Sequence, residues 1–358
     1  MHNIPGAAFS AQAVRKFQNE FNDLMLVHVR HLQGLIVQNS VTVDGKTIVP
    51  RSAQQRLLTD AGNYVQRIFV GSDYRSAYAS DGVTPLADYP KLLNKWLVWV
   101  TYKVVDSHAK YMARALPDDI KQWLNNRVAV EMVGGNPLAV YSAPHTWVDP
   151  RGYRLSDRIW GVSVRTRTQI DNLLLEGINT GRSSLDIAKD LEQFLLPNRK
   201  PFRTRRPYGS DASFDAMRLA RSEITRAHSY ASFAAATANP FVDGWDFALS
   251  AQHPKIDICD TLATIGMGGE RLKDPYPLDG GDVPIPVQDT HPQCICTGRP
   301  AVIRSRKEII DQLRTMMGQG DDAPITPINV YNFLKVLLGA YLANLIFTEI
   351  LQQLGVQP

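Results

Sequence analysis

The stretch Met217–Leu249 reads MRLARSEITRAHSYASFAAATANPFVDGWDFAL, and the period of its hydrophobic pattern changes within it. Before Pro240, apolar and small side chains recur every three or four residues, which predicts a helix packed closely against a neighbour. After Pro240 the period becomes two, because Trp245, Phe247 and Leu249 alternate with more polar residues, which predicts a half-buried strand. This change of period predicts an α+β fold that is mostly helical.

Toward the N-terminus, the spacing of apolar residues predicts a region of long helices over residues 1–150. The exception is the segment 41–49, where Asp44-Gly45 stands between β-branched runs and predicts a short hairpin. Ser52 is expected to cap the helix that follows. A stretch rich in Gly, Pro and aromatic residues, 133–156, predicts an irregular connector, so we expect a domain boundary near residue 150.

Residues 151–300 predict a compact α+β middle domain with a small sheet. Gly181 follows a helical stripe and suits the left-handed conformation that ends helices, and Ser183 or Ser184 can cap the next helix. Val283–Val287 also alternates, and its two prolines predict a strand at a sheet edge.

Residues 301–329 predict a charged helix and a polar linker, and residues 330–358 an apolar C-terminal helix. Because that last helix is apolar on nearly every side, it must be buried, either within the chain, in a partner or by self-association. Its most apolar run, Val336–Thr348, is too short to span a bilayer, so we expect no stable membrane span.

Composition excludes several classes of protein. The chain has 358 residues, with 39 Lys and Arg against 35 Asp and Glu, so its net charge of +4 does not indicate a nucleic-acid coat. Three cysteines exclude a disulfide scaffold. The N-terminal residues lack the pattern of a secretory signal, so we expect folding in a reducing cytoplasm.

All three cysteines lie near histidines in two short strings, HPKIDICD at 253–260 and HPQCIC at 291–296. Thiolates and imidazoles from two such strings can hold one Zn²⁺ tetrahedrally. The candidate ligands are Cys259, His291, Cys294 and Cys296, with His253 and Asp257 in reserve. Two alternatives stay open: buried thiols that close a small sheet, and a disulfide from Cys259 to one of the other cysteines.

The helix string Ala220–His228 is dense in polar groups. Glu223 or His228 could serve as a general base. The competing interpretation is a solvated helix face on which Glu223 and Arg226 pair across one turn.

A basic loop precedes this helix and could contact the phosphates of a nucleic acid. A solvated or protein-interface loop is the alternative, because only one aromatic residue lies within it. The candidate nucleic-acid contacts are Arg199, Lys200, Arg203, Arg205 and Arg206. The chain has no phosphate-binding loop, nucleophile elbow or zinc-protease helix, so we expect no enzymatic activity.

Six strings in this order resemble the phage head morphogenesis family, the minor head proteins similar to the Mu F protein. They are Ser156–Trp160, Gly181–Ala188, Ala220–His228, Gly244-Trp245, His253–Asp260 and His291–Cys296. Ile295 departs from the family, which usually has Arg between the last two cysteines.

The resemblance implies a virion component in the capsid interior or at the portal vertex, present in the host cytoplasm during assembly. Its implied partners are the portal protein, the major capsid protein and packaged double-stranded DNA, which the basic loop could contact. Its implied role is to assist head assembly and the handling of that DNA. Two other functions stay open: a metal-dependent hydrolase or toxin-like enzyme, and a membrane-active DNA ejection protein.

Overall fold

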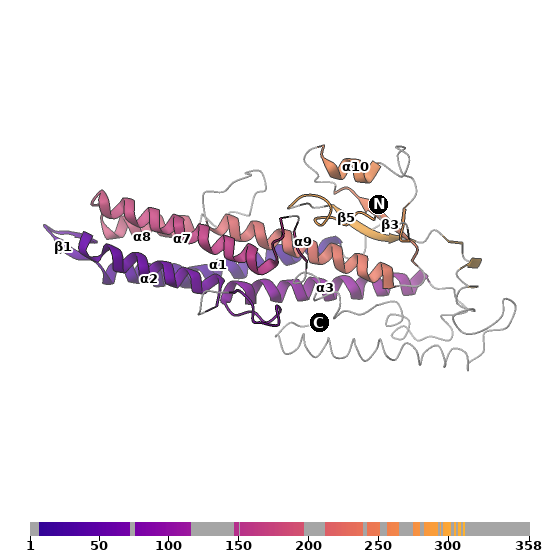
Figure 1. The fold of residues 1–358 in the computed structure, drawn as a ribbon, viewed down its shortest axis with the longest axis horizontal. Helices are drawn as coiled ribbons and strands as arrows, with labels where there is room; N and C mark the ends of the chain where they lie inside the picture. Colours follow the sequence, from indigo (N-terminus) through magenta and orange to yellow (C-terminus); the bar gives the residue numbers. More distant parts are fainter. Residues whose placement is uncertain are drawn as a thin grey trace. The chain divides into compact units, whose positions relative to one another are not determined.

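The computed structural model describes residues 7–71, 76–115, 147–149, 151–196, 212–238, 242–250, 256–264, 275–279, 283–292, 294, 296–301, 304–305, 307–308 and 311. The fold is mostly helical α+β with small antiparallel sheets, as predicted (Figure 1). The chain forms two compact units, and each is built from separate segments. The helical unit comprises Val14–Trp96 and His145–Arg221, and the sheet unit comprises Met1–Ala13, Leu97–Pro144 and Ser222–Pro358. The domain bounds at residues 150, 300 and 329 stay predictions.

Aromatic side chains form the centre of the helical unit. Phe17 and Phe21 of α1 (Ala7–Gln38) stack with their ring centroids 5.7 Å apart. Tyr89, at the start of α3 (Asp88–Ala115), packs perpendicular to both rings. The centroid of its ring lies 5.1 Å from that of Phe69, at the end of α2 (Arg51–Phe69). All four rings are fully buried, so they account for much of the apolar area that holds these helices together.

The predicted hairpin is confirmed. β1 (Val41–Val43) pairs with β2 (Lys46–Ile48), and the turn between them places Asp44 at φ 49° and Gly45 at φ 77°. Two consecutive residues with positive φ are typical of the tight turn that Asp-Gly favours. The expected Ser52 cap is wrong, because α2 already begins at Arg51 after Pro50, whose fixed φ suits a helix start.

α7 (Leu155–Asn179) lies beside α2 and is followed by α8 (Ser184–Leu195) (Figure 1). Gly181 has φ 64° and ends α7 as predicted. The Ser183 hydroxyl accepts a hydrogen bond from the Asp186 N–H at 3.1 Å, which confirms Ser183 as the cap of α8. Both ends follow from local residue chemistry.

The sheet unit contains a three-stranded antiparallel sheet. β3 (Gly244–Ala248) is central, with β4 (Tyr276–Pro277) on one side and β5 (Thr297–Ala301) on the other. Trp245 is fully buried, and Phe233 of α9 (Ala212–Ala238) meets its ring edge-on at 5.4 Å. The indole N–H donates to the Pro284 carbonyl at 2.9 Å, so the segment around Pro284 is fastened to the sheet.

The prediction of an edge strand at 283–287 is wrong, because this segment is irregular. The two edges of the three-stranded sheet are β4 and β5. Pro284 and Pro286 have no N–H to donate to a ladder, and the Ile285 and Val287 N–H groups donate to the side chains of Asp289 and Thr290 instead. The apolar helix predicted at 330–358 lies outside the described residues, as does most of 301–329. Among the described residues, no helix combines the length and apolar character needed to cross a membrane.

Candidate metal centre

The first arm of the site is the start of α10 (Ile258–Thr264). The Asp257 carboxylate accepts a hydrogen bond from the Cys259 N–H at 2.8 Å. The Asp257 N–H in turn donates to the Asp260 carboxylate at 2.8 Å, so the first turn of this short helix is held at both ends. Cys259 is completely buried beneath this turn.

The second arm is the irregular chain that leads into β5. The Val287 N–H donates to the Thr290 hydroxyl at 2.9 Å, and the Cys294 N–H donates to the His291 carbonyl at 3.2 Å. Val287 is buried with φ 70°, a conformation that a β-branched residue adopts only under constraint from its surroundings. These contacts turn His291 and Cys294 toward Cys259.

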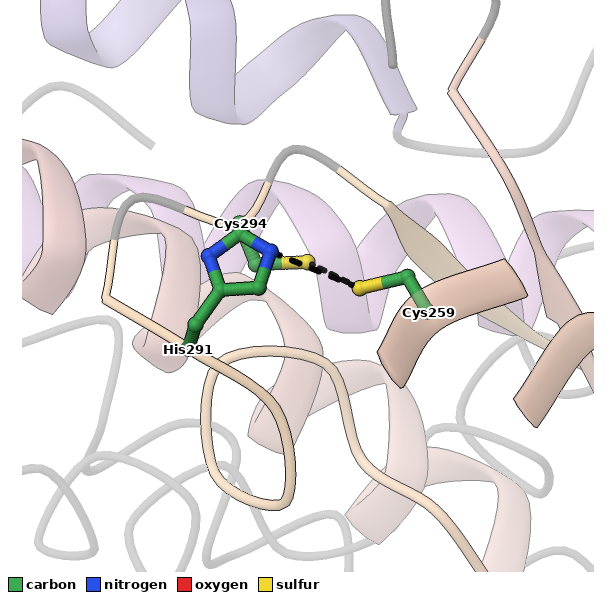
Figure 2. Close-up of side chains that lie close together, drawn as sticks. All are labelled: Cys259, His291 and Cys294. Carbon is green, nitrogen blue, oxygen red and sulfur yellow. Dashed lines mark hydrogen bonds between the residues drawn. The ribbon is translucent and has the colours of Figure 1, made fainter. Parts of the chain in front are cut away.

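Cys259, His291 and Cys294 meet at one point (Figure 2). The Cys259 sulfur lies 3.4 Å from the Cys294 sulfur and 3.6 Å from the His291 Nε2, and all three donor atoms lie within 4.8 Å of one another. Around a tetrahedral zinc ion, two sulfurs are about 3.8 Å apart and a sulfur and a nitrogen about 3.6 Å apart. The spacing of the three donors therefore fits a metal ion.

The His291 ring is oriented by its other nitrogen. Nδ1 lies 3.0 Å from the Pro292 carbonyl and can donate its N–H there, which leaves Nε2 directed at the thiols. Ligating histidines are commonly held in this way by a backbone carbonyl. The Asp257 carboxylate lies 3.1 Å from the same Nε2, so Asp257, the reserve ligand in the sequence analysis, borders the site.

Cys296, the fourth candidate ligand, is also completely buried and packs with Phe247 and Val287 in the same core, but its sulfur is not among the three donor atoms that lie within 4.8 Å of one another. A hydrogen bond from Cys296 lowers the pKa of the Cys294 thiol to about 5, although burial alone would raise it. The same contact raises the pKa of Cys296, and burial together with the nearby Cys294 raises that of Cys259. The Cys294 thiol therefore loses its proton easily. Cys259 and Cys296 lose theirs only when a nearby cation compensates the additional negative charge.

Several residues around the thiols were not predicted. The Thr290 side chain and the Ser250 backbone form hydrogen bonds with Cys294 and Cys296. Thr290 precedes His291 directly, so its position next to a candidate ligand was the available signal. No local signal connects Ser250 to Cys296, because the two meet only when β3 pairs with β5.

The polar string on α9 is buried, which corrects the interpretation of a solvated helix face. Glu223 and Arg226 do pair across one turn, with their closest atoms 2.6 Å apart, but the Glu223 side chain is only 1% exposed and that of Arg226 only 7%. His228 is equally buried. The candidate ligand His253 and the basic loop of Arg199, Lys200, Arg203, Arg205 and Arg206 lie outside the described residues.

Comparisons with protein-family models, with curated proteins and with solved structures find no match. The family resemblance therefore stays a prediction that rests on the motifs themselves.

Proposed function

We propose that the thiols and imidazole of this site hold one structural zinc ion, and that the chain acts as a non-enzymatic minor head protein of a phage particle. The observation that carries the first part is the meeting of Cys259, His291 and Cys294 at distances that suit tetrahedral zinc. Thiolate and imidazole ligands together favour zinc over the oxygen-seeking cations Mg²⁺ and Ca²⁺.

The ion would fasten parts of the sheet unit that have little secondary structure of their own. α10 has seven residues, β4 has two, and the chain from Val283 to Pro292 is irregular. Cys259 lies on α10, and His291 and Cys294 lie on the irregular chain, so a shared ion would join the two arms. A structural metal contributes its binding free energy directly to folding in such a region.

Cys296 completes a closed set of ligands in this proposal. A catalytic zinc needs an open coordination position for water or substrate, whereas four protein ligands leave none. Cys296 is buried and in hydrogen-bond contact with Cys294, and this supports its role as the fourth ligand. A closed site supports a scaffold rather than an enzyme.

The head-protein part of the proposal is supported by the order of the six motifs. Four of them, which contain Ile224, Trp245, Cys259 and Cys294, contribute buried residues to the sheet unit. In this proposal the partners are the portal protein and the major capsid protein, and the chain is located in the capsid interior or at the portal vertex.

Two measurements test the two parts separately. Elemental analysis of the full chain, purified under reducing conditions, should find one zinc per chain. Co-expression with the portal and major capsid proteins of the same phage, followed by size-exclusion chromatography, should yield a complex. A chain that contains zinc but binds neither protein would refute the head-protein role and leave the metal role standing.

A further inference from the structure

The segment 147–167, in the helical unit, gathers arginines and exposed aromatic rings around the start of α7. It contains five arginines and two aspartates, with no lysine or glutamate. Tyr153 is 48% exposed, and the Arg151 side chain is 73% exposed. The proposed metal site does not include these side chains.

A rigid turn presents the first of these groups to solvent. The Asp149 carboxylate accepts hydrogen bonds from the N–H groups of Arg151 and Tyr153, at 2.9 and 3.0 Å, and from the Arg151 guanidinium at 3.0 Å. Gly152 completes the turn at φ 86°, where a side chain would be strained. The Asp149 side chain is only 8% exposed, so its charge is used inside the turn while Arg151 and Tyr153 face outward.

The neighbouring groups are ordered in the same way. The Arg151 guanidinium lies 5.3 Å from the centre of the Tyr153 ring, and the Arg158 guanidinium lies 4.9 Å from that of Trp147. The second aspartate, Asp157, accepts a hydrogen bond from the Arg154 N–H at 2.8 Å. Three of the five arginines form ion pairs, Arg151 with Asp149, Arg165 with Asp215 and Arg167 with Asp171, so the positive charge of the surface beside the rings rests mainly on Arg154 and Arg158.

We propose that this arginine–aromatic surface, defined by Trp147, Arg151, Tyr153, Arg154 and Arg158, binds single-stranded nucleic acid. The guanidinium groups match the charge and geometry of phosphates. Exposed rings can stack on unpaired bases, whereas the bases of a duplex already stack on one another. An acidic protein surface would match the charge but would leave the rings without stacking partners. The inference goes beyond the proposed function and does not depend on the metal.

The test uses the full chain and measures the fluorescence anisotropy of two labelled ligands, an oligothymidine of about 20 nucleotides and a DNA duplex of about 20 base pairs. Each titration is repeated at salt concentrations from roughly 50 to 200 mM. We expect at least tenfold tighter binding of the single strand. Arg151→Gln with Arg154→Gln should weaken that binding about tenfold and reduce the salt slope by about 1.4. Arg30→Gln with Arg51→Gln removes two exposed arginines from α1 and α2, and should change neither quantity.

The aromatic part is tested by Tyr153→Leu and Trp147→Leu, which keep apolar bulk but remove the rings. Each should weaken binding of oligothymidine about tenfold without changing the salt slope. Circular dichroism melting of every variant checks that it is folded. The proposal is overturned if the duplex binds equally well, if the leucine variants bind normally, or if polyglutamate of equal charge displaces the strand as effectively as unlabelled oligothymidine. That last result would assign the surface to an acidic protein. None of these outcomes affects zinc content or binding to head proteins.

Discussion

The Cys259 sulfur lies 3.4 Å from the Cys294 sulfur, although 35 positions separate the two residues in the chain. Both thiols are buried, and Cys294 is followed closely by the buried Cys296. Packing thiols this close without a shared ion or a covalent bond gives the fold little, because each would remain a weak hydrogen-bond donor.

Removal of the metal should destabilise the sheet unit. Chelation under reducing conditions, or Cys294→Ser, should remove the zinc and lower the free energy of unfolding by about 3 kcal/mol or more, because the ion binds only the folded site. Elemental analysis and thermal melting measure the two effects. Ile256→Ser, at a position 93% exposed just before the site, is the matched control and should keep both the zinc and the melting temperature. Retention of one zinc by Cys294→Ser would contradict the assignment.

The fourth ligand can be identified by spectroscopy after replacement of zinc by Co²⁺. Thiolate-to-cobalt charge-transfer absorption increases with the number of bound sulfurs, and a tetrahedral site gives intense visible bands. Cys296→Ser should reduce the charge-transfer absorption by about one third, as expected for loss of one sulfur from three. Asp257→Asn should leave it unchanged. If Asp257→Asn instead alters the spectrum and Cys296→Ser does not, Asp257 is the fourth ligand.

Metal binding should release protons and weaken in acid. Burial and the neighbouring Cys294 raise the pKa of Cys259, and the hydrogen bond with Cys294 raises that of Cys296, so both thiols stay protonated near neutral pH without a cation. The ion must displace those protons, and its apparent affinity therefore falls as the pH falls. Competition with a chelator at several pH values between about 6 and 8 measures the slope, which should be steeper for the natural chain than for Cys296→Ser. Equal slopes would remove Cys296 from the ligand set.

His28 should make the helical unit sensitive to acid. Burial lowers the pKa of His28 below its usual 6.5, and His31 lowers it further, while Asp88 opposes the shift. Its Nδ1 lies 2.8 Å from the Tyr64 hydroxyl. Below pH 6.5 the unfolded chain takes up a proton more readily than the folded chain, so stability is present above that pH and is lost as the pH falls toward the lowered pKa. Urea titrations from pH 7.5 to 5.5, in steps of roughly one unit, measure the loss.

Two variants separate His28 from its neighbour. His28→Gln should be less stable at neutral pH, because it loses a buried contact, but its stability should fall less in acid. His31→Gln leaves His28 in place and should retain the acid loss. Equal pH dependence in His28→Gln and the natural chain would show that another group is responsible.

Local signals predicted local structure well. Asp44-Gly45 specified the hairpin turn, and Ser183 specified the start of α8, because each acts through its own backbone conformation or a hydrogen bond three residues away. The segment around Pro284 was wrongly predicted to be an edge strand. Its alternating pattern carries no information about Tyr276–Pro277, the short strand that pairs with Gly244 and Trp245. The burial of Glu223 and Arg226 was missed for the same reason, since it depends on surfaces distant in the sequence.

The site shows the same division. Cysteine and histidine are rare and chemically distinctive, so their clustering in two short strings was enough to predict that Cys259, His291 and Cys294 could share an ion. Sequence alone left Asp257 in reserve, and only the fold places its carboxylate 3.1 Å from the His291 Nε2. The carbonyl of Pro292 that orients the ring has no sequence signature, because every residue has a carbonyl.

The contact between Gly298 and Trp245 should tolerate no side chain. Gly298 on β5 lies directly opposite Phe247, and a methyl group placed on it would overlap the buried indole ring of Trp245. The indole cannot move aside easily, because its N–H donates to the Pro284 carbonyl and its ring packs perpendicular to that of Phe233. Gly298→Ala should therefore destabilise the sheet unit by about 3 kcal/mol, at the upper end of the cost of overpacking, and it should weaken zinc binding by displacing β5.

Gly34→Ala is the matched control, since a methyl group on that α1 glycine would meet no atom within 4 Å and should stabilise the helix by up to about 1 kcal/mol. Urea unfolding followed by tryptophan fluorescence, with zinc content measured on the same samples, compares the two variants. An unchanged midpoint and full zinc content in Gly298→Ala would mean that the sheet does not hold Trp245 against Gly298.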